Sequence, residues 1–237
     1  MTSCDMNQHV LERRMRQALY DKKWKVFVAR SWPWRYLPFV ECVLAAGSMA
    51  TGEVHEHSDF DVIVAAKQGR IFTARFFSVF VFGTLGWRRP KLSHKDAANN
   101  KLCLNHFVTE TSYRFEPPWN SYSENLYRNL VPIFGNAEQV NNFFEANKEL
   151  TVVERIYRDD LRHVYRISSS CRAWIEKKLS NGLGNRLEQF LKRIQIARIE
   201  KSLRHDPLGH NPRIRYGDEE LEFHPDTKRI EEFVTKN

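Results

Sequence analysis

Cysteine is scarce in this sequence of 237 residues, and the four copies lie far apart: Cys4, Cys42, Cys103 and Cys171. No Cys-x-x-Cys pair occurs, so the pattern excludes both a disulfide-stabilised scaffold and a zinc ribbon. Residues 1–19 are rich in charge and lack the apolar core of a secretory signal peptide. Together these absences predict a protein of the reducing cytoplasm.

Long hydrophobic runs are also missing. The most apolar segment is residues 71–87, which contains Arg75 and is shorter than the roughly 20 apolar residues that cross a bilayer. We therefore expect a buried core helix at 71–86 and no association with a membrane. A guanidinium inside such a helix has to be paired, so the expected partner of Arg75 is a carboxylate or a nucleotide phosphate.

The positive charge is unevenly distributed. The net charge is +8, with 8 Lys and Arg against 3 Asp and Glu in residues 1–38, and 13 against 6 in residues 151–205. Such segments attract a polyanion, which here would be a nucleoside triphosphate, RNA or an acidic protein. They also match the solvated faces of ordinary amphipathic helices, and both interpretations stay open.

The hydrophobic pattern predicts an α+β fold. Runs of apolar and β-branched residues indicate strands at 39–48, 59–66 and 101–109. Helical spacing of apolar residues indicates helices at 5–30, 71–86, 123–131, 137–147, 151–178 and 183–205. A hairpin at 213–223 is expected to turn at Gly217-Asp218, with a last helix after Pro225. The expected architecture is a small mixed sheet with flanking helices and a helical C-terminal half, divided into residues 1–38, 39–116 and 117–237.

Two aspartates stand at the start of the second strand. Asp59 and Asp61 are two positions apart, so their side chains project from the same face of a sheet. Two neighbouring carboxylates repel each other, and Mg²⁺ relieves that repulsion by binding one or two carboxylates together with substrate phosphates. Gly47 and Ser48 end the preceding strand, where a glycine lets backbone N–H groups approach a phosphate and a serine adds a donor. The sequence therefore predicts a phosphate-binding turn beside a metal site.

This combination carries a family resemblance. Gly-Ser, ten residues, and then Asp-x-Asp in a strand resembles the nucleotidyltransferase superfamily of the polymerase-beta type. With Ala50, Gly52 and Ser58 in place, the string is similar to the minimal nucleotidyltransferase branch. Residues 59–86, the strand at 101–108 and Phe223-His224-Pro225 also look like a group of uncharacterised bacterial nucleotidyltransferase-domain proteins.

The resemblance implies a nucleotidyltransferase core at 39–116, preceded by a basic helix. Asp59 and Asp61 would be catalytic and hold Mg²⁺ or Mn²⁺, while Gly47, Ser48 and Ser58 would bind the nucleotide. The reaction would move a nucleoside monophosphate from a nucleoside triphosphate to a hydroxyl, with release of pyrophosphate. A third carboxylate on a later strand would complete a two-metal site.

The third carboxylate is not evident, because the strand at 101–109 contains no acid. Glu110 at its end is the first choice as the third catalytic residue, and Glu116 is the second. Asn105 lies in mid-strand, and its amide can ligate a metal but cannot take a proton. Alternation puts Glu110 on one face with Leu102, Leu104, His106 and Val108, and Asn105 on the other with Cys103 and Phe107. Only one face can look toward the aspartates unless a bulge intervenes.

Three functions stay open on this reading. The first is a nucleotidyltransferase whose acceptor is a protein, a small molecule or an RNA end. The second is a non-catalytic nucleotide-binding or antitoxin-like interaction module that lacks a complete carboxylate triad. The third is an RNA-binding protein that uses the basic residues of 151–205.

Overall fold

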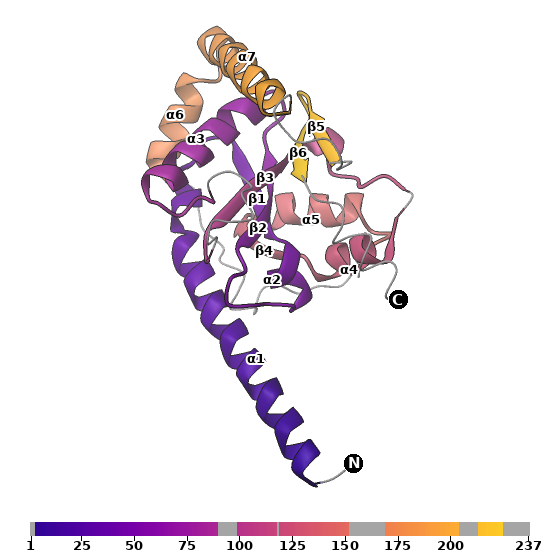
Figure 1. Ribbon diagram of the computed structural model, residues 1–237. Coiled ribbons are helices and arrows are strands. Elements are labelled where there is room, and N and C mark those ends of the chain that lie inside the picture. The colour runs from indigo at the N-terminus through magenta and orange to yellow at the C-terminus, as the bar shows by residue number, and fades with distance from the viewer. Residues whose placement is uncertain (1–2, 90–98, 118, 152–168, 204–212, 225–237) are drawn as a thin grey trace.

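The computed structural model describes residues 3–89, 99–117, 119–151, 169–203 and 213–224. Within them six strands form one sheet in the order β4-β1-β2-β3-β6-β5 (Figure 1). The strands are β1 (Val40–Ala45), β2 (Phe60–Ala66), β3 (Leu102–Val108), β4 (Val131–Gly135), β5 (Arg213–Tyr216) and β6 (Glu220–His224). The helices are α1 (Ser3–Arg30), α2 (Gly47–Thr51), α3 (Ile71–Thr84), α4 (Ser121–Asn129), α5 (Ala137–Ala146), α6 (Ser170–Lys178) and α7 (Gly182–Leu203), with 3₁₀ turns η1 (Trp32–Tyr36) and η2 (Glu110–Ser112). The predicted α+β class with a mixed sheet is confirmed.

The sheet combines local and distant strand pairs. β1 and β2 are antiparallel neighbours. β2 and β3 are parallel neighbours in the sheet, and α3 lies between them in the sequence. The hairpin predicted at 213–223 is present as β5 and β6, and β6 also pairs with β3. β4, which the sequence pattern did not predict, pairs with β1. Segments on both sides of residue 116 therefore share one sheet.

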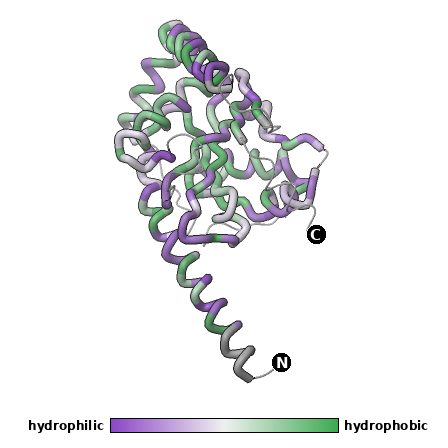
Figure 2. The backbone as a smooth tube through the Cα atoms, viewed as in Figure 1, coloured by the Kyte–Doolittle hydropathy of each residue, from purple (hydrophilic) through white to green (hydrophobic). Residues whose placement is uncertain are grey.

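Each face of the sheet is covered by helices with a separate apolar core. On one face, side chains such as Phe60, Val62, Val64, Leu104 and Phe107 pack with residues of α1, η1, α3 and α7. On the other face, Ile63, Ala65 and Val108 pack with residues of α4 and α5. Figure 1 shows these two helical layers on either side of the strands, and Figure 2 shows apolar segments gathered on the central strands. The odd-numbered side chains of β2, Asp61 among them, therefore belong to the α4–α5 face.

The apolar segment at 71–86 forms a helix, α3, but the helix is buried on one face only. Phe72 and Phe82 are fully enclosed, whereas Phe76 and Phe80 are 41% and 57% exposed. A buried core helix was the expectation, and the structure buries one face of it. Among the described residues, no helix combines the length and the apolar character needed to cross a membrane.

Helix α7 packs against α3 through two buried polar contacts. The carboxylate of Glu188 accepts hydrogen bonds from the backbone N–H groups of Phe72 and Thr73, both at 2.9 Å. These are first-turn amides of α3, which have no acceptor within their own helix. Arg75 donates to Oε1 of Gln195 at 2.7 Å and lies over the ring of Phe223. Arg75 thus contacts an amide and an aromatic ring, where a carboxylate or a phosphate was expected.

Other predicted elements agree in outline. Helix α1 covers the predicted 5–30 segment and projects from the body of the molecule (Figure 1). Its C-terminal part is anchored by Trp24 and Phe27, which are buried, while Val10, Leu11 and Met15 are exposed. Most of the predicted helix at 151–178 and the helix after Pro225 lie outside the described residues.

Candidate metal and nucleotide site

The two aspartates come together at the start of β2. One oxygen of Asp59, one of Asp61 and the sulfur of Cys103 all lie within 4.8 Å of one another. Cys103 reaches the group because β3 runs parallel to β2 with Cys103 paired to Asp61. The aspartates are partly exposed and the cysteine is buried. The predicted pairing of the two carboxylates on one side of the strand is therefore present, and its third member is a thiol.

Gly47 is packed directly against Asp61. It has φ +56, and a Cβ built on it would lie 2.1 Å from Oδ2 of Asp61 and 2.9 Å from its Cγ. The next strand fixes this approach, because the backbone N–H of Ala46 donates to the carbonyl oxygen of Asp61 at 2.9 Å. Only glycine fits both the left-handed backbone and the close contact. The sequence prediction of a glycine turn beside the carboxylates thus has a geometric reason.

A cation already faces the carboxylates. Nη1 of Arg89 lies 2.6 Å from Oδ2 of Asp59, with both side chains largely buried. Burial alone would lower the pKa of Arg89, but the charge of Asp59 and the hydrogen bond to it outweigh burial and raise the pKa. The guanidinium occupies the place of a counter-ion, which shows that the pair of acids needs positive charge in this setting. Two carboxylate groups and a thiol, packed beside Gly47, are ligand types that fit a divalent ion.

Lys23 of α1 holds the loop that leads into β2. Its Nζ donates to the carbonyl oxygens of Glu56 at 2.8 Å and Ser58 at 2.7 Å. Burial lowers the pKa of Lys23, and the charges of Asp59 and Glu56 offset part of that effect. The long first helix is thereby tied to the site, a contact that no local sequence pattern indicated.

The predicted nucleotide-binding serines differ in their surroundings. Ser48 is the second residue of α2, directly after Gly47, and is partly buried. The hydroxyl oxygen of Ser58 accepts a hydrogen bond from the backbone N–H of His55 at 2.9 Å. Ser58 therefore stabilises the loop turn, and Ser48 remains the candidate donor of the predicted pair.

Glu110, the expected third carboxylate, requires a correction. Cys103 is opposite Asp61 in the parallel pair, and Glu110 follows the far end of β3 in η2. At about 3.3 Å per residue, the intervening strand separates Glu110 from Asp61 by roughly 20 Å. Glu116 is exposed and lies 3.7 Å from Nε of Arg114. Among the described residues, neither glutamate joins the Asp59–Asp61 group.

A bulge interrupts β3 next to Asn105. Cys103 pairs with Asp61, but the next pair is His106 with Ile63. The strand thus gains one residue between these pairs, and strict alternation no longer holds. His106 and Val108 consequently lie on the opposite face from Leu104, contrary to the predicted grouping.

Burial and charge keep the Cys103 thiol protonated in this arrangement. The thiol is 5% exposed. Burial raises the pKa of Cys103 well above its ordinary value, and the negative charges of Asp61 and Asp59 raise it further. A hydrogen bond between the Cys103 side chain and Asp61 raises the pKa of the thiol as well.

A second polar group, which the sequence did not single out, lies farther along the sheet. Nε2 of His106 and a carboxylate oxygen from each of Glu220 and Glu222 lie within 4.8 Å of one another. Glu220 is 3.2 Å from His106 and 2.9 Å from Nη1 of Arg215. Burial alone would raise the pKa of Glu220, but hydrogen bonds from His106 and Arg215 lower it to about 2. In this polar network the His106–Glu220 hydrogen bond links β3 to β6, and the Arg215–Glu220 ion pair links β5 to β6.

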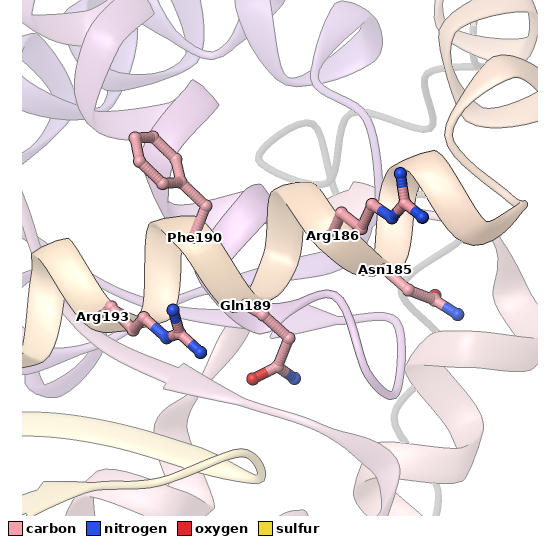
Figure 3. A pocket seen from close by; sticks show the side chains of 5 residues that line it. All are labelled: Asn185, Arg186, Gln189, Phe190 and Arg193. Carbon is pink, nitrogen blue, oxygen red and sulfur yellow. The ribbon is translucent and has the colours of Figure 1, made fainter.

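A surface hollow lies along α7. Asn185, Arg186, Gln189, Phe190 and Arg193 line it, all from the one helix (Figure 3). Its lining contains two guanidinium groups, two side-chain amides and no carboxylate.

Comparisons with family models, with curated proteins and with solved structures gave no match for this chain. The functional assignment therefore depends on the site itself.

Proposed function

We propose that this chain binds a nucleoside triphosphate together with a divalent cation and transfers the nucleoside monophosphate to a hydroxyl acceptor. One observation carries the proposal: Asp59 and Asp61 converge with Cys103 within 4.8 Å, against a Gly47 that has no room for a side chain. A reducing compartment such as the cytoplasm suits a site with a free thiol. A protein side chain, a small molecule or an RNA end can serve as the acceptor.

Each residue has a role that follows from its chemistry. Asp59 and Asp61 would hold the cation, which when bound supplies positive charge to the triphosphate. Gly47 lets the backbone come close to phosphate oxygens, and Ser48 adds a hydroxyl donor. Arg89 neutralises Asp59 in the cation-free protein, and its guanidinium is suited to pair with a phosphate once a metal takes over that carboxylate.

A specific observation also favours the second candidate, a non-catalytic nucleotide-binding module. The position paired with Asp61 on the parallel strand is Cys103, where an active two-metal enzyme would have a third acid. A protonated thiol cannot serve as that acid's carboxylate. On this alternative the chain binds the nucleotide and its cation without turnover.

Two measurements on the full chain separate these candidates. The first is calorimetric titration with ATP and with GTP in the presence of Mg²⁺, before and after chelation. We expect binding that chelation abolishes and that the double change Asp59→Asn, Asp61→Asn weakens at least about 10-fold, the lower end of what damage to a metal site costs. Glu53→Gln is the matched control, because it removes an exposed acid of the same loop and should bind like the wild type.

The second measurement is transfer of α-labelled nucleotide to macromolecules or small molecules of a cell lysate. Labelling that depends on Asp59 and Asp61 supports the transferase. Binding without labelling supports the non-catalytic module. Equal nucleotide affinity in the wild type and the double variant would contradict both.

A further inference from the structure

Cys103 stands at the point where the Asp59–Asp61 site lacks a third protein ligand. It is paired with Asp61 across parallel strands, and its sulfur belongs to the same group of donor atoms. It is 5% exposed and already hydrogen-bonded to Asp61. The register of β3 against β2 fixes the position of Cys103.

We propose that Cys103 is the third metal ligand of this site, and that the position takes Zn²⁺ or a similarly thiophilic divalent ion in preference to Mg²⁺. This inference rests on the proposed function, since it uses the same carboxylates. It adds the identity of the third ligand and the class of metal.

The donor atoms decide the preference. Mg²⁺ takes oxygen ligands and keeps several waters, whereas thiolate ligands select softer ions. Zn²⁺ binds both cysteine sulfur and aspartate oxygen, and zinc sites with three protein ligands leave a fourth position for water or substrate. Asp59, Asp61 and Cys103 supply such a set. A second ion, Mg²⁺, would still travel with the triphosphate.

Binding of the metal to Cys103 breaks one bond, forms one bond and releases one proton. The S–H bond of Cys103 breaks, a sulfur–metal bond forms, and the proton passes to the buffer without any oxidation or reduction. The ion pair between Arg89 and Asp59 opens, because the metal replaces the guanidinium as counter-charge. The buried thiol is therefore deprotonated by the metal itself.

The test uses the reduced full chain without nucleotide and Cd²⁺ as a spectroscopic probe. We expect an ultraviolet sulfur-to-metal charge-transfer band in the wild type that Zn²⁺ displaces and Mg²⁺ does not. Cys103→Ser should lack the band and bind Zn²⁺ at least about 10-fold more weakly. Cys171→Ser is the control, because it removes an exposed thiol outside the site and should keep the band.

A second readout needs no variant. X-ray absorption of the Zn²⁺ complex should show a sulfur ligand at about 2.3 Å from the metal. Cys103→Asp replaces sulfur with oxygen ligands and should shift the preference from Zn²⁺ toward Mg²⁺.

The outcomes separate this inference from the proposed function. A band that persists in Cys103→Ser, or a Zn²⁺ complex that shows no sulfur ligand, overturns the ligand assignment even where nucleotide binding still requires Asp59 and Asp61. A band that requires Cys103, in a chain that binds no nucleotide, supports the metal ligand and overturns the proposed function.

Discussion

Gly47 offers the sharpest test of the site, because a single methyl group perturbs it. In Gly47→Ala the new Cβ would lie 2.1 Å from Oδ2 of Asp61, far inside van der Waals contact. Rotation of the Asp61 side chain relieves the contacts with its carboxylate group, while the Cβ of Asp61 stays in tight contact with the new Cβ at 3.0 Å. Rotation takes its carboxylate out of the group that includes Asp59 and Cys103.

The effect on stability divides into two parts. The left-handed φ of +56 at Gly47 penalises any residue with a Cβ by about 1–2 kcal/mol. Displacing Asp61 from its preferred rotamer adds about 0.5–1.5 kcal/mol. Gly52→Ala isolates the first part, since Gly52 has φ +81 and nothing within 4 Å of the position of its Cβ.

We expect the two variants to differ modestly in stability and strongly in cation binding. Urea denaturation should show Gly47→Ala less stable than Gly52→Ala by about 0.5–1.5 kcal/mol. Calorimetry should show cation affinity at least about 10-fold lower in Gly47→Ala and unchanged in Gly52→Ala. Equal cation affinity in the two variants would refute the argument that the contact with Gly47 fixes the Asp61 carboxylate.

Two further predictions concern the contacts that hold the sheet and its helices. Glu188→Ala should destabilise the protein by about 2–4 kcal/mol in urea denaturation, because it leaves buried amides of Phe72 and Thr73 without their charged acceptor; a loss below about 0.5 kcal/mol would show that water replaces it. For Glu220 the folded-state pKa of about 2 lies below the ordinary 4.5, so its stabilisation is complete above about pH 4.5 and is lost as the pH falls toward 2. Glu220→Gln should therefore unfold with a weaker acid dependence in that range, and an unchanged acid profile would refute the role of this ion-pair network.

Local patterns predicted β1, β2, β3 and the β5–β6 hairpin and missed β4. β1, β2 and β3 are runs of apolar and β-branched residues, which specify buried strands by composition alone. β4 has the sequence Val-Pro-Ile-Phe-Gly. A segment of this length that contains a proline is hard to distinguish from a loop. It is tolerated as a strand because it lies at the edge of the sheet, where a missing N–H costs no ladder bond.

The candidate site was predicted for the residues close in sequence and not for those brought in by register. Gly47 lies just after β1, and Asp59 and Asp61 lie at the start of the adjacent β2. Their spacing in the sequence therefore indicated that they would lie close together. The choice between Asn105 and Glu110, and the place of Cys103 in the group, depended on how β3 aligns with β2, and nothing local fixes the register of a parallel pair. The bulge in β3 added a second uncertainty, because one inserted residue reverses every side chain beyond it.

The pairing of β6 with β3 has a consequence for how the chain reaches its native state. Val108 pairs with Glu220. The edge of β3 that faces β6 therefore gains its partner only after more than a hundred intervening residues have been synthesised and folded. Contacts of such long sequence separation slow folding, since the chain loses loop entropy before they form. Until then β3 presents unpaired backbone groups on an apolar strand, which is an opening for intermolecular association. We therefore expect the yield of refolded protein to fall steeply as the protein concentration rises, even though the folded protein itself is stable.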